Sequence, residues 1–342
     1  MASLKYLLSY FSSSGKKSKF LCYSKHFMRW CLPSLFCRKR LGKKLSSAFN
    51  YDDIEYIKKR VNYYNKLSVV TPLPSKAEKL SAHKLTKKKT IYFFDSYEYT
   101  RFFPKDLRWL HRFGDKTYVP ESPTIVKSRP VGKANANSIL LKLNKIRHFL
   151  FVKDPVPFEK KKDLVIFRGA VKKKSARLEF MKMYFGHPMC NLGAVGRKTI
   201  VPHNWKVPKI TIREHLDYKF IMALEGNDVA TNLKWIMSSN SLAVMPKPKN
   251  ETWFMEETLI PNYHYVEIRD DFSDLEERLK YYIDHTNEAQ KILDNANKYV
   301  SQFWNKNRED IISLLVLEKY FCLTGQSNPT DEESRLFFND DG

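Results

Sequence analysis

The sequence predicts an α/β protein in which strands and helices alternate along the C-terminal half of the chain. An apolar run at residues 220–224 ends abruptly at 225–228, Glu-Gly-Asn-Asp, and apolar residues at helical spacing follow up to Met237. A strand, a tight turn and a helix in this order build nucleotide sites in α/β proteins, because ligands gather where strands end and helices begin. Further short apolar runs at 242–245 and 264–268 predict two more strands.

The length and composition indicate a folded protein with anionic partners. A chain of 342 residues is long enough for two domains, and its 43% hydrophobic fraction excludes a largely disordered protein. The 60 Lys and Arg against 37 Asp and Glu give a formal net charge of +23. Such a charge favours nucleic acid, an acidic membrane surface or phosphorylated substrates without choosing among them.

The cysteines predict neither disulfides nor a metal site. They form no CxxC pair, and their odd number is typical of reduced thiols in the cytosol. The five are Cys22, Cys31, Cys37, Cys190 and Cys322. No stretch reaches the roughly 18 apolar residues that a membrane-spanning helix requires, so we expect a soluble or peripheral protein without a secretory signal.

Residues 1–48 form a basic, aromatic-rich N-terminal extension. Lys and Arg cluster at 16–19 and 38–44, with aromatic and aliphatic side chains between the clusters. A segment of this kind can lie on an anionic bilayer, where each basic residue near the surface contributes about 1 kcal/mol. The alternative is a set of surface helices that pack on the N-terminal domain and expose a solvated basic face.

We expect a first domain at residues 49–155. Apolar positions at helical spacing predict a helix over 51–66, and the prolines and lysines of 71–88 indicate a linker. The run Thr-Ile-Tyr-Phe-Phe at 90–94 predicts a buried strand, and 107–113 is expected to be helical until Gly-Asp breaks it.

The end of this domain is rich in proline. Residues 120–130 contain too many prolines for a helix and are expected to form an extended loop. A helix or strand should follow over 138–151. The prolines and lysines of 152–162 then mark the expected domain boundary.

Residues 156–325 are expected to form the second domain, which contains the alternating strands and helices. A strand at 164–167 and a helix at 175–184 precede the series described above. Ser273 begins a Ser-Asp-Leu-Glu capping box, which predicts a helix that starts there. The remaining segments are helices at 288–303 and 311–321 and a mobile acidic tail at 326–342.

Several motifs in a fixed order resemble glycosyltransferase family 90. They are Phe-Arg-Gly at 167–169, Glu-Gly-Asn at 225–227, Leu-Ile-Pro and His-Tyr within 259–265, and Asp-Asp-Phe-Ser-Asp-Leu at 270–275. The resemblance covers residues 89–304 and is nearest to the bacterial branch, which contains enzymes of lipopolysaccharide assembly. It implies a GT-B-like fold, in which two Rossmann-like domains face a cleft, and a metal-independent, inverting transfer from a nucleotide sugar without another cofactor.

The resemblance implies a donor site in the second domain, because a departing diphosphate needs cations or backbone amides. The expected donor-binding residues are Arg168, Gly169, Lys172, Arg177, Glu225, Gly226, Asn227, Asp228, Thr231, Asn232, Lys234 and Glu257. Eukaryotic members carry an Arg where Asn232 stands, so Arg168 or Lys234 is the expected source of positive charge. The alternatives are a solvated charge run for the lysines and simple helix capping for Asn227 or Asp228.

Three further features bear on the donor site. Glu256 and Glu257 are adjacent, so at most one of them is expected to face the ligand. The pair His264-Tyr265 lies in an apolar strand, where a hydrogen-bonded structural His is the favoured interpretation. No Asp-x-Asp flanked by apolar residues is present, which agrees with a metal-independent family.

The catalytic base is expected in the first domain. Asp115 is the first choice, because the preceding Gly presents it on a loop; the alternative interpretation is a turn former. Glu121 and Asp95 are competing candidates. Lys127 and Arg129 are expected to contact a phosphorylated or acidic acceptor.

The leading hypothesis is an inverting glycosyltransferase that moves a hexose from a UDP-sugar to a lipopolysaccharide core or similar cell-surface glycan. It would act as a peripheral protein on the cytoplasmic face of the inner membrane. One alternative is a nucleic-acid-binding protein, but no RNP-like, zinc-knuckle or helix-turn-helix pattern supports it, and we expect no nucleic acid partner. A catalytically silent, membrane-associated scaffold is the other alternative, which the departure at Asn232 keeps open.

Overall fold

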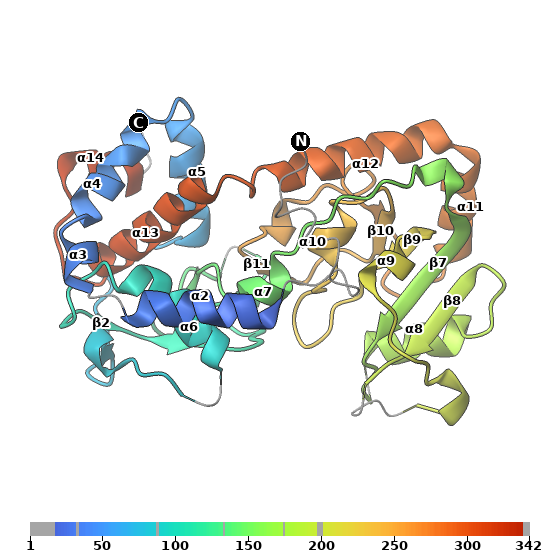
Figure 1. Cartoon of the computed structure of the whole chain (residues 1–342), viewed down its shortest axis with the longest axis horizontal. Helices are drawn as coiled ribbons and strands as arrows, with labels where there is room; N and C mark the ends of the chain where they lie inside the picture. The colour runs from blue at the N-terminus through green and yellow to red at the C-terminus, as the bar shows by residue number, and fades with distance from the viewer. Residues whose placement is uncertain are drawn as a thin grey trace. The chain divides into compact units, whose positions relative to one another are not determined.

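The structure is a computed structural model that describes residues 18–31, 34–86, 89–132, 134–173, 175–196 and 201–337 (Figure 1). The described chain forms two compact units. Unit 1 comprises residues 146–249 and 256–302, and unit 2 comprises residues 20–145, 250–255 and those from 303 onward. The sequence predicts one division at 155–156. In the structure the chain passes to unit 1 at 145–146 and enters unit 2 again at 250–255, because these residues pair with a strand of that unit.

Unit 1 is built on a five-stranded parallel sheet with the order β12-β10-β9-β7-β8. Its strands are β7 (Lys162–Gly169), β8 (Cys190–Ala194), β9 (Tyr218–Met222), β10 (Leu242–Met245) and β12 (Val266–Glu267). The register sets Val165 of β7 beside Phe220 of β9 and Val244 of β10 beside Val266 of β12. The predicted α/β class and its parallel strands are confirmed, and all strands end at one edge of the sheet.

The helices of unit 1 pack on this sheet through regularly spaced apolar residues. They are α8 (Ala176–Tyr184), α9 (Ile212–His215), α10 (Leu233–Ile236), α11 (Leu275–Asp284) and α12 (Thr286–Ser301). On α12, Ala289, Ile292 and Ala296 recur at helical spacing and are buried. The expected capping box does not form, because the Ser273 hydroxyl donates to the carboxylate of Asp271 and α11 starts without a side-chain cap.

Unit 2 combines helices with three small sheets. Its principal helices are α5 (Ile54–Tyr64), α6 (Thr90–Thr100) and α13 (Lys306–Leu323). One sheet is parallel and contains β3 (His111–Arg112), β4 (Thr124–Val126) and β6 (Ser138–Leu140). The other two are antiparallel pairs. One joins β1 (Glu78–Lys79) to β2 (Arg108–Trp109), and the other joins β5 (Ser128–Pro130) to β11 (Asn250–Thr252). The short helix α7 (Lys145–His148) lies where the chain passes to unit 1.

Two predicted elements of unit 2 are wrong. The expected strand at 90–94 is the first half of α6, in which Tyr92, Ser96 and Tyr99 are buried at helical spacing. The expected helix at 107–113 consists of the strands β2 and β3. Burial of the α6 side chains at 90–94 and strand pairing at 108–112 override the local preference of the sequence.

Glu309 of α13 connects the parts of unit 2 through a buried polar cluster. Its carboxylate lies 2.8 Å from Arg60 of α5 and 2.8 Å from Lys142, and the indole Nε1 of Trp253 donates to it at 2.7 Å. The stacked rings of Trp253 and Tyr64 lie 3.7 Å apart beside this cluster. Breaking a buried ion pair of this kind leaves an uncompensated charge, so the cluster is expected to be important for stability.

The two ends of the described chain are helical. The segment expected to be a mobile tail contains α14 (Asp331–Phe337), which packs on α5, with the Asn62 amide donating to Leu336 O at 3.0 Å. A capping box between Thr330 and Glu333 begins this helix. The N-terminal extension contains α2 (Lys19–Cys31), α3 (Ser34–Arg38) and α4 (Leu41–Ser46), while residues 1–17 lie outside the described part.

None of the helices in the described ranges is both long and apolar enough to span a lipid bilayer.

Candidate functional site

The loops that follow β7, β9, β10 and β12 meet at the carboxyl edge of the unit 1 sheet, because all of these strands run parallel. Ligands of α/β proteins bind at this edge. The edge contains Gly169, at the end of β7, and the turn 225–227 after β9. A hydrogen bond from Lys249 N to the Glu225 carboxylate, at 3.0 Å, ties the loop after β10 to this turn.

Arg177, in the first turn of α8, joins the two central loops. Its Nε donates to Glu225 O at 3.0 Å, its Nη2 to Leu224 O at 2.7 Å and its Nη1 to Ala170 O at 3.1 Å. Burial lowers the pKa of Arg177, but a guanidinium remains charged in proteins. These three bonds occupy three of its five N–H donors, so the group can support the loops and also donate to an anion.

The two predicted glycines are closely packed, Gly226 against Arg177 and Gly169 against Phe167. A Cβ added at Gly226 would lie 3.0 Å from Arg177 Nη2, and one added at Gly169 would lie 2.7 Å from the ring of Phe167. A side chain at either position would therefore displace a neighbour. The glycines allow the loops after β7 and β9 to approach each other.

Lys172 supplies a second positive charge at this edge. It is exposed in the loop after β7, and its Nζ donates to the Asn227 side chain in the loop after β9. The structure thus brings six of the predicted donor residues together, from two neighbouring loops and the start of α8: Gly169, Lys172, Arg177, Glu225, Gly226 and Asn227.

Arg168 is turned toward the neighbouring strand. Its guanidinium donates to Asn191 O at 2.8 Å and to Asn191 Oδ1 at 2.6 Å, both on β8. Burial lowers its pKa. Arg168 therefore holds β7 to β8, and Arg177 and Lys172 are the cations that face the loops.

The other predicted donor residues lie on or near α10. Asp228 is buried, while Thr231, Asn232 and Glu257 are half-buried. The Asn232 amide donates to Met222 O at 2.9 Å and so attaches the start of α10 to the end of β9. Lys234 is buried in an ion pair with Glu256. Its charge is therefore compensated inside unit 1 and is not directed at a diphosphate, and Glu257 is the more exposed of the two adjacent glutamates.

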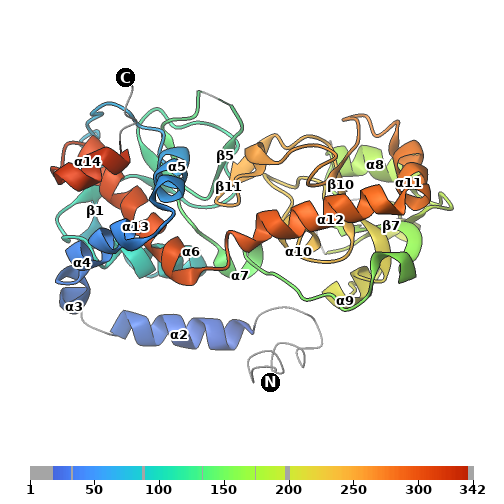
Figure 2. The ribbon, with the colours of Figure 1, turned by 90° about the horizontal axis from the view of Figure 1, so that it is seen from above.

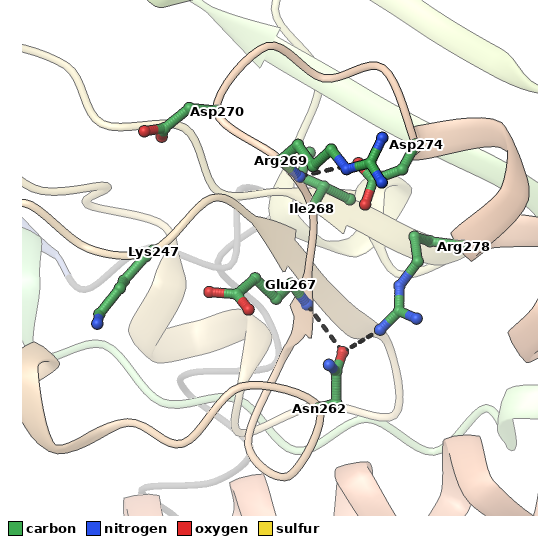
Figure 3. Close-up of a pocket in the computed structure, with 8 residues that line it drawn as sticks. All are labelled: Lys247, Asn262, Glu267, Ile268, Arg269, Asp270, Asp274 and Arg278. Carbon is green, nitrogen blue, oxygen red and sulfur yellow. Dashed lines mark hydrogen bonds between the residues drawn. The ribbon is translucent and has the colours of Figure 1, made fainter.

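A pocket of about 360 Å³ opens at the same edge, beyond β10 and β12 (Figure 3). Three cations and three carboxylates line it together with Asn262 and Ile268: Lys247, Arg269, Arg278, Glu267, Asp270 and Asp274. Arg278 and the backbone of Glu267 both donate to Asn262 Oδ1. Its volume is within the range of small-molecule sites.

The predicted base and acceptor residues lie in unit 2. Asp115 follows Gly114, whose φ of +106° is accessible mainly to glycine, and its Oδ1 accepts from Lys127 Nζ at 2.6 Å. Arg129 is fully buried, paired with Glu251 at 2.7 Å and bonded to carbonyl groups of three other residues. Arg129 therefore connects α5, β5, β6 and β11, whereas Asp115 lies at the surface of unit 2.

The competing bases have different surroundings. Asp95 of α6 is fully buried, and burial raises its pKa to about 6 although Lys145 opposes the shift. Glu121 is exposed in the loop before β4. Of these carboxylates, Asp95 is inaccessible to an acceptor, so Asp115 and Glu121 are the accessible candidates.

One group of side chains in the described part of the chain has the composition of a metal site: His26, Asp95 and Glu98. Its charges are already balanced, because Arg29 and Lys145 each lie 2.8 Å from the Glu98 carboxylate. An added divalent cation would be repelled by both. The group is therefore best described as a buried polar cluster that joins α2 to α6.

His264 has a structural environment, as expected from the sequence. Its Nδ1 accepts from Ile260 N at 2.9 Å, and its ring lies 5.0 Å from that of Tyr299. Burial lowers the pKa of His264, which favours the neutral ring.

Comparison with known proteins assigns the family. A family model described as Glycosyl transferase family 90 matches residues 142–330, which is more than half of the chain. The O-glucosyltransferase LpsA of Dichelobacter nodosus is 40% identical over 305 residues, which are 88% of this chain and 94% of that protein. The chain belongs to glycosyl transferase family 90.

The family 90 match includes the whole parallel sheet of unit 1 and the loops at its carboxyl edge. The enzyme class is therefore that of the glycosyltransferases, with a sugar donor and an acceptor as substrates. A shorter stretch is similar to the uncharacterized protein 179R of Invertebrate iridescent virus 6, with 31% identity over 117 residues. This stretch covers 32% of this chain and 10% of that protein.

Sequence reasoning about this family 90 chain missed the cationic pocket residues. Lys247, Arg269 and Arg278 are not among the residues that the sequence singles out. The positions of Lys247 and Arg269 just after β10 and β12 are a signal that was available, because both strands end at the ligand-binding edge.

Proposed function

We propose that the protein is an inverting glycosyltransferase that transfers glucose from a UDP-sugar to a lipopolysaccharide core or similar glycan. The observation that carries this proposal is the 40% identity, over nearly the whole of both chains, to a protein named as an O-glucosyltransferase. The cationic carboxyl edge of the unit 1 sheet supports it, because a nucleoside diphosphate requires such an edge.

Lys172 and Arg177 are the proposed ligands of the diphosphate. The two side chains come from the loop after β7 and the start of α8 and converge on the turn at Glu225 and Asn227. Their positive charges would stabilise the departing diphosphate. In metal-dependent enzymes a divalent cation has this role, so no metal ion would be needed here. No further cofactor is needed for this reaction.

Asp115 is the proposed base. In an inverting step the acceptor hydroxyl oxygen forms a bond to the anomeric carbon, and the bond from that carbon to the diphosphate breaks. The hydroxyl proton passes to the Asp115 carboxylate and the electron pair leaves with the diphosphate. The Lys127 Nζ, 2.6 Å from the Asp115 carboxylate, would fix the position of this carboxylate.

This division of roles corresponds to a GT-B-like enzyme, in which one domain holds the donor and the other presents the acceptor. Unit 1 would be the donor domain and unit 2 the acceptor domain. A lipid-linked acceptor would place the enzyme on the cytoplasmic face of the inner membrane, where nucleotide sugars are available.

The proposal is tested by a donor screen. Purified protein is incubated with a panel of nucleotide sugars, with and without EDTA, and the free nucleotide is measured in wild type, Asp115→Asn and Glu121→Gln. We expect release from one UDP-sugar that survives EDTA, collapses in Asp115→Asn and persists in Glu121→Gln. Absence of turnover and binding for every donor, also with truncated lipopolysaccharide present, would reject the proposal and favour the scaffold or nucleic-acid alternatives.

A further inference from the structure

The helix α2 lies at the outside of the ribbon of unit 2 (Figure 2), and its exposed side chains are largely apolar. Eight of the eighteen large apolar side chains that are exposed in the described part of the chain lie within residues 20–36. On α2 they include Phe20, Phe27 and Met28, and on α3 they include Leu35 and Phe36, with exposed fractions between 52% and 78%. Exposed apolar groups of this density on a folded protein mark an interaction surface.

The opposite face of α2 is the polar one, and it is attached to α6. Arg29 lies 2.8 Å from Glu98, and Arg101 donates to Arg29 O at 2.6 Å. The His26 ring stacks on Phe94 with the ring centres 5.5 Å apart. A helix on a water-soluble protein normally buries its apolar face, so the orientation of α2 is inverted.

Positive charge borders the apolar surface. Lys25 on α2 and Lys39, Arg40 and Lys43 after α3 are exposed. Aromatic and aliphatic side chains beside lysine and arginine suit the interface of a bilayer that contains anionic lipids, because the rings enter the headgroup region while the cations attract the phosphates.

We propose that the exposed faces of α2 and α3, with the cations that follow them, form a docking surface for an anionic lipid bilayer. The surface consists of Phe20, Phe27, Met28, Trp30, Leu35 and Phe36 and the border of Lys25, Lys39, Arg40 and Lys43. The inference is independent of the proposed transfer reaction, since none of these residues belongs to the donor loops or is a candidate base. The structure thus assigns the membrane contact to one face of unit 2.

The test is vesicle co-sedimentation of the full chain. Binding is compared between vesicles of phosphatidylcholine alone and vesicles that also contain phosphatidylglycerol, for wild type and for two double variants. Phe27→Ser with Met28→Ser removes apolar contacts, and Lys39→Ala with Lys43→Ala removes charge. A matched control, Val69→Ser with Val70→Ser, changes two exposed apolar residues of unit 2 outside the surface.

We expect binding only to the anionic vesicles, a loss of about tenfold or more in the apolar variant, and a loss of about fivefold per removed charge in the lysine variant. The control should bind like wild type. Quenching of Trp30 fluorescence by brominated lipids, absent in Trp30→Phe, would report insertion of this face.

Two results would overturn the inference. Binding of the apolar variant at the wild-type level would place the membrane contact elsewhere. A change in oligomeric state in that variant, measured by light scattering without vesicles, would show that a second copy of the chain covers the surface. Nucleotide release from the UDP-sugar in solution should be equal in all these variants, so failure of the donor screen and failure of docking are distinguishable.

Discussion

Replacement of Gly226 by Ala tests the role of Arg177 without changing any charge. The added Cβ would lie 3.0 Å from Arg177 Nη2, and no positive φ makes the residue itself strained. The guanidinium must shift by a few tenths of an ångström, which lengthens its 2.7 Å bond to Leu224 O. A charge-assisted hydrogen bond contributes about 1.5–3 kcal/mol. The same shift moves the guanidinium away from the proposed position of the diphosphate, so partial loss of one such bond from Arg177 to the donor should weaken donor binding by about 1–2 kcal/mol, or about 5- to 30-fold.

The assay is the KM for the donor together with the melting temperature, and the matched control is Gly42→Ala. A Cβ at Gly42, in α4, meets nothing within 4 Å. We expect Gly226→Ala to raise the donor KM with a small change in melting temperature, and the control to leave the donor KM unchanged and the melting temperature equal or slightly higher. A Gly226→Ala enzyme with a wild-type donor KM and a lower melting temperature would show that Arg177 only holds the loops together.

Three further predictions concern individual charges. Glu309→Ala leaves Arg60 and Lys142 buried without their partner, so urea unfolding should show a loss of about 3–5 kcal/mol; an unchanged midpoint would contradict the stabilising role of this cluster. Lys234→Ala should similarly lower the melting temperature, since it leaves the Glu256 carboxylate buried without its ion-pair partner. Lys172→Ala should raise the donor KM and leave the melting temperature unchanged, because Lys172 is exposed. The reverse pattern would exchange the roles assigned to these two lysines. Burial would raise the pKa of Glu98, but the nearby charges of Lys145 and Arg29 lower it to about 2. The contribution of Glu98 to folding stability is therefore complete above its unfolded pKa and is lost as the pH falls toward 2. The raised pKa of Asp95, about 6, gives a stability slope of the opposite sign that wild type and variant share. Glu98→Gln should therefore flatten the loss of stability between about pH 4 and 2, while an unchanged slope would refute the assignment.

The parallel sheet of unit 1 could be predicted from the sequence, because its strands are short apolar runs that end at sharp polar turns. Residues 164–167, 220–224 and 242–245 have this pattern, and the strands β7, β9 and β10 lie there. Unit 2 was harder to predict. Residues 90–94 favour a strand by local preference, but their rings are buried on a helix, and only the packing of α6 decides between the two.

The candidate site was predictable by position and less so by role. The two glycines and the turn at Glu225 followed from the strand-turn-helix order, and the structure places them together. The charge partners were not predictable, because Lys234 and Arg129 look like available cations in the sequence. Their partners Glu256 and Glu251 lie 22 and 122 residues away in the chain, and only the fold brings them together.

The most direct test of the central claim is the product of a single reaction. The protein is incubated with UDP-glucose and truncated lipopolysaccharide, and the product is analysed by mass spectrometry and proton NMR. We predict the addition of one hexose in β linkage, the inverse of the α configuration in the donor, and loss of this product in Asp115→Asn. An α-linked product, or no addition of hexose from UDP-glucose, would contradict the account.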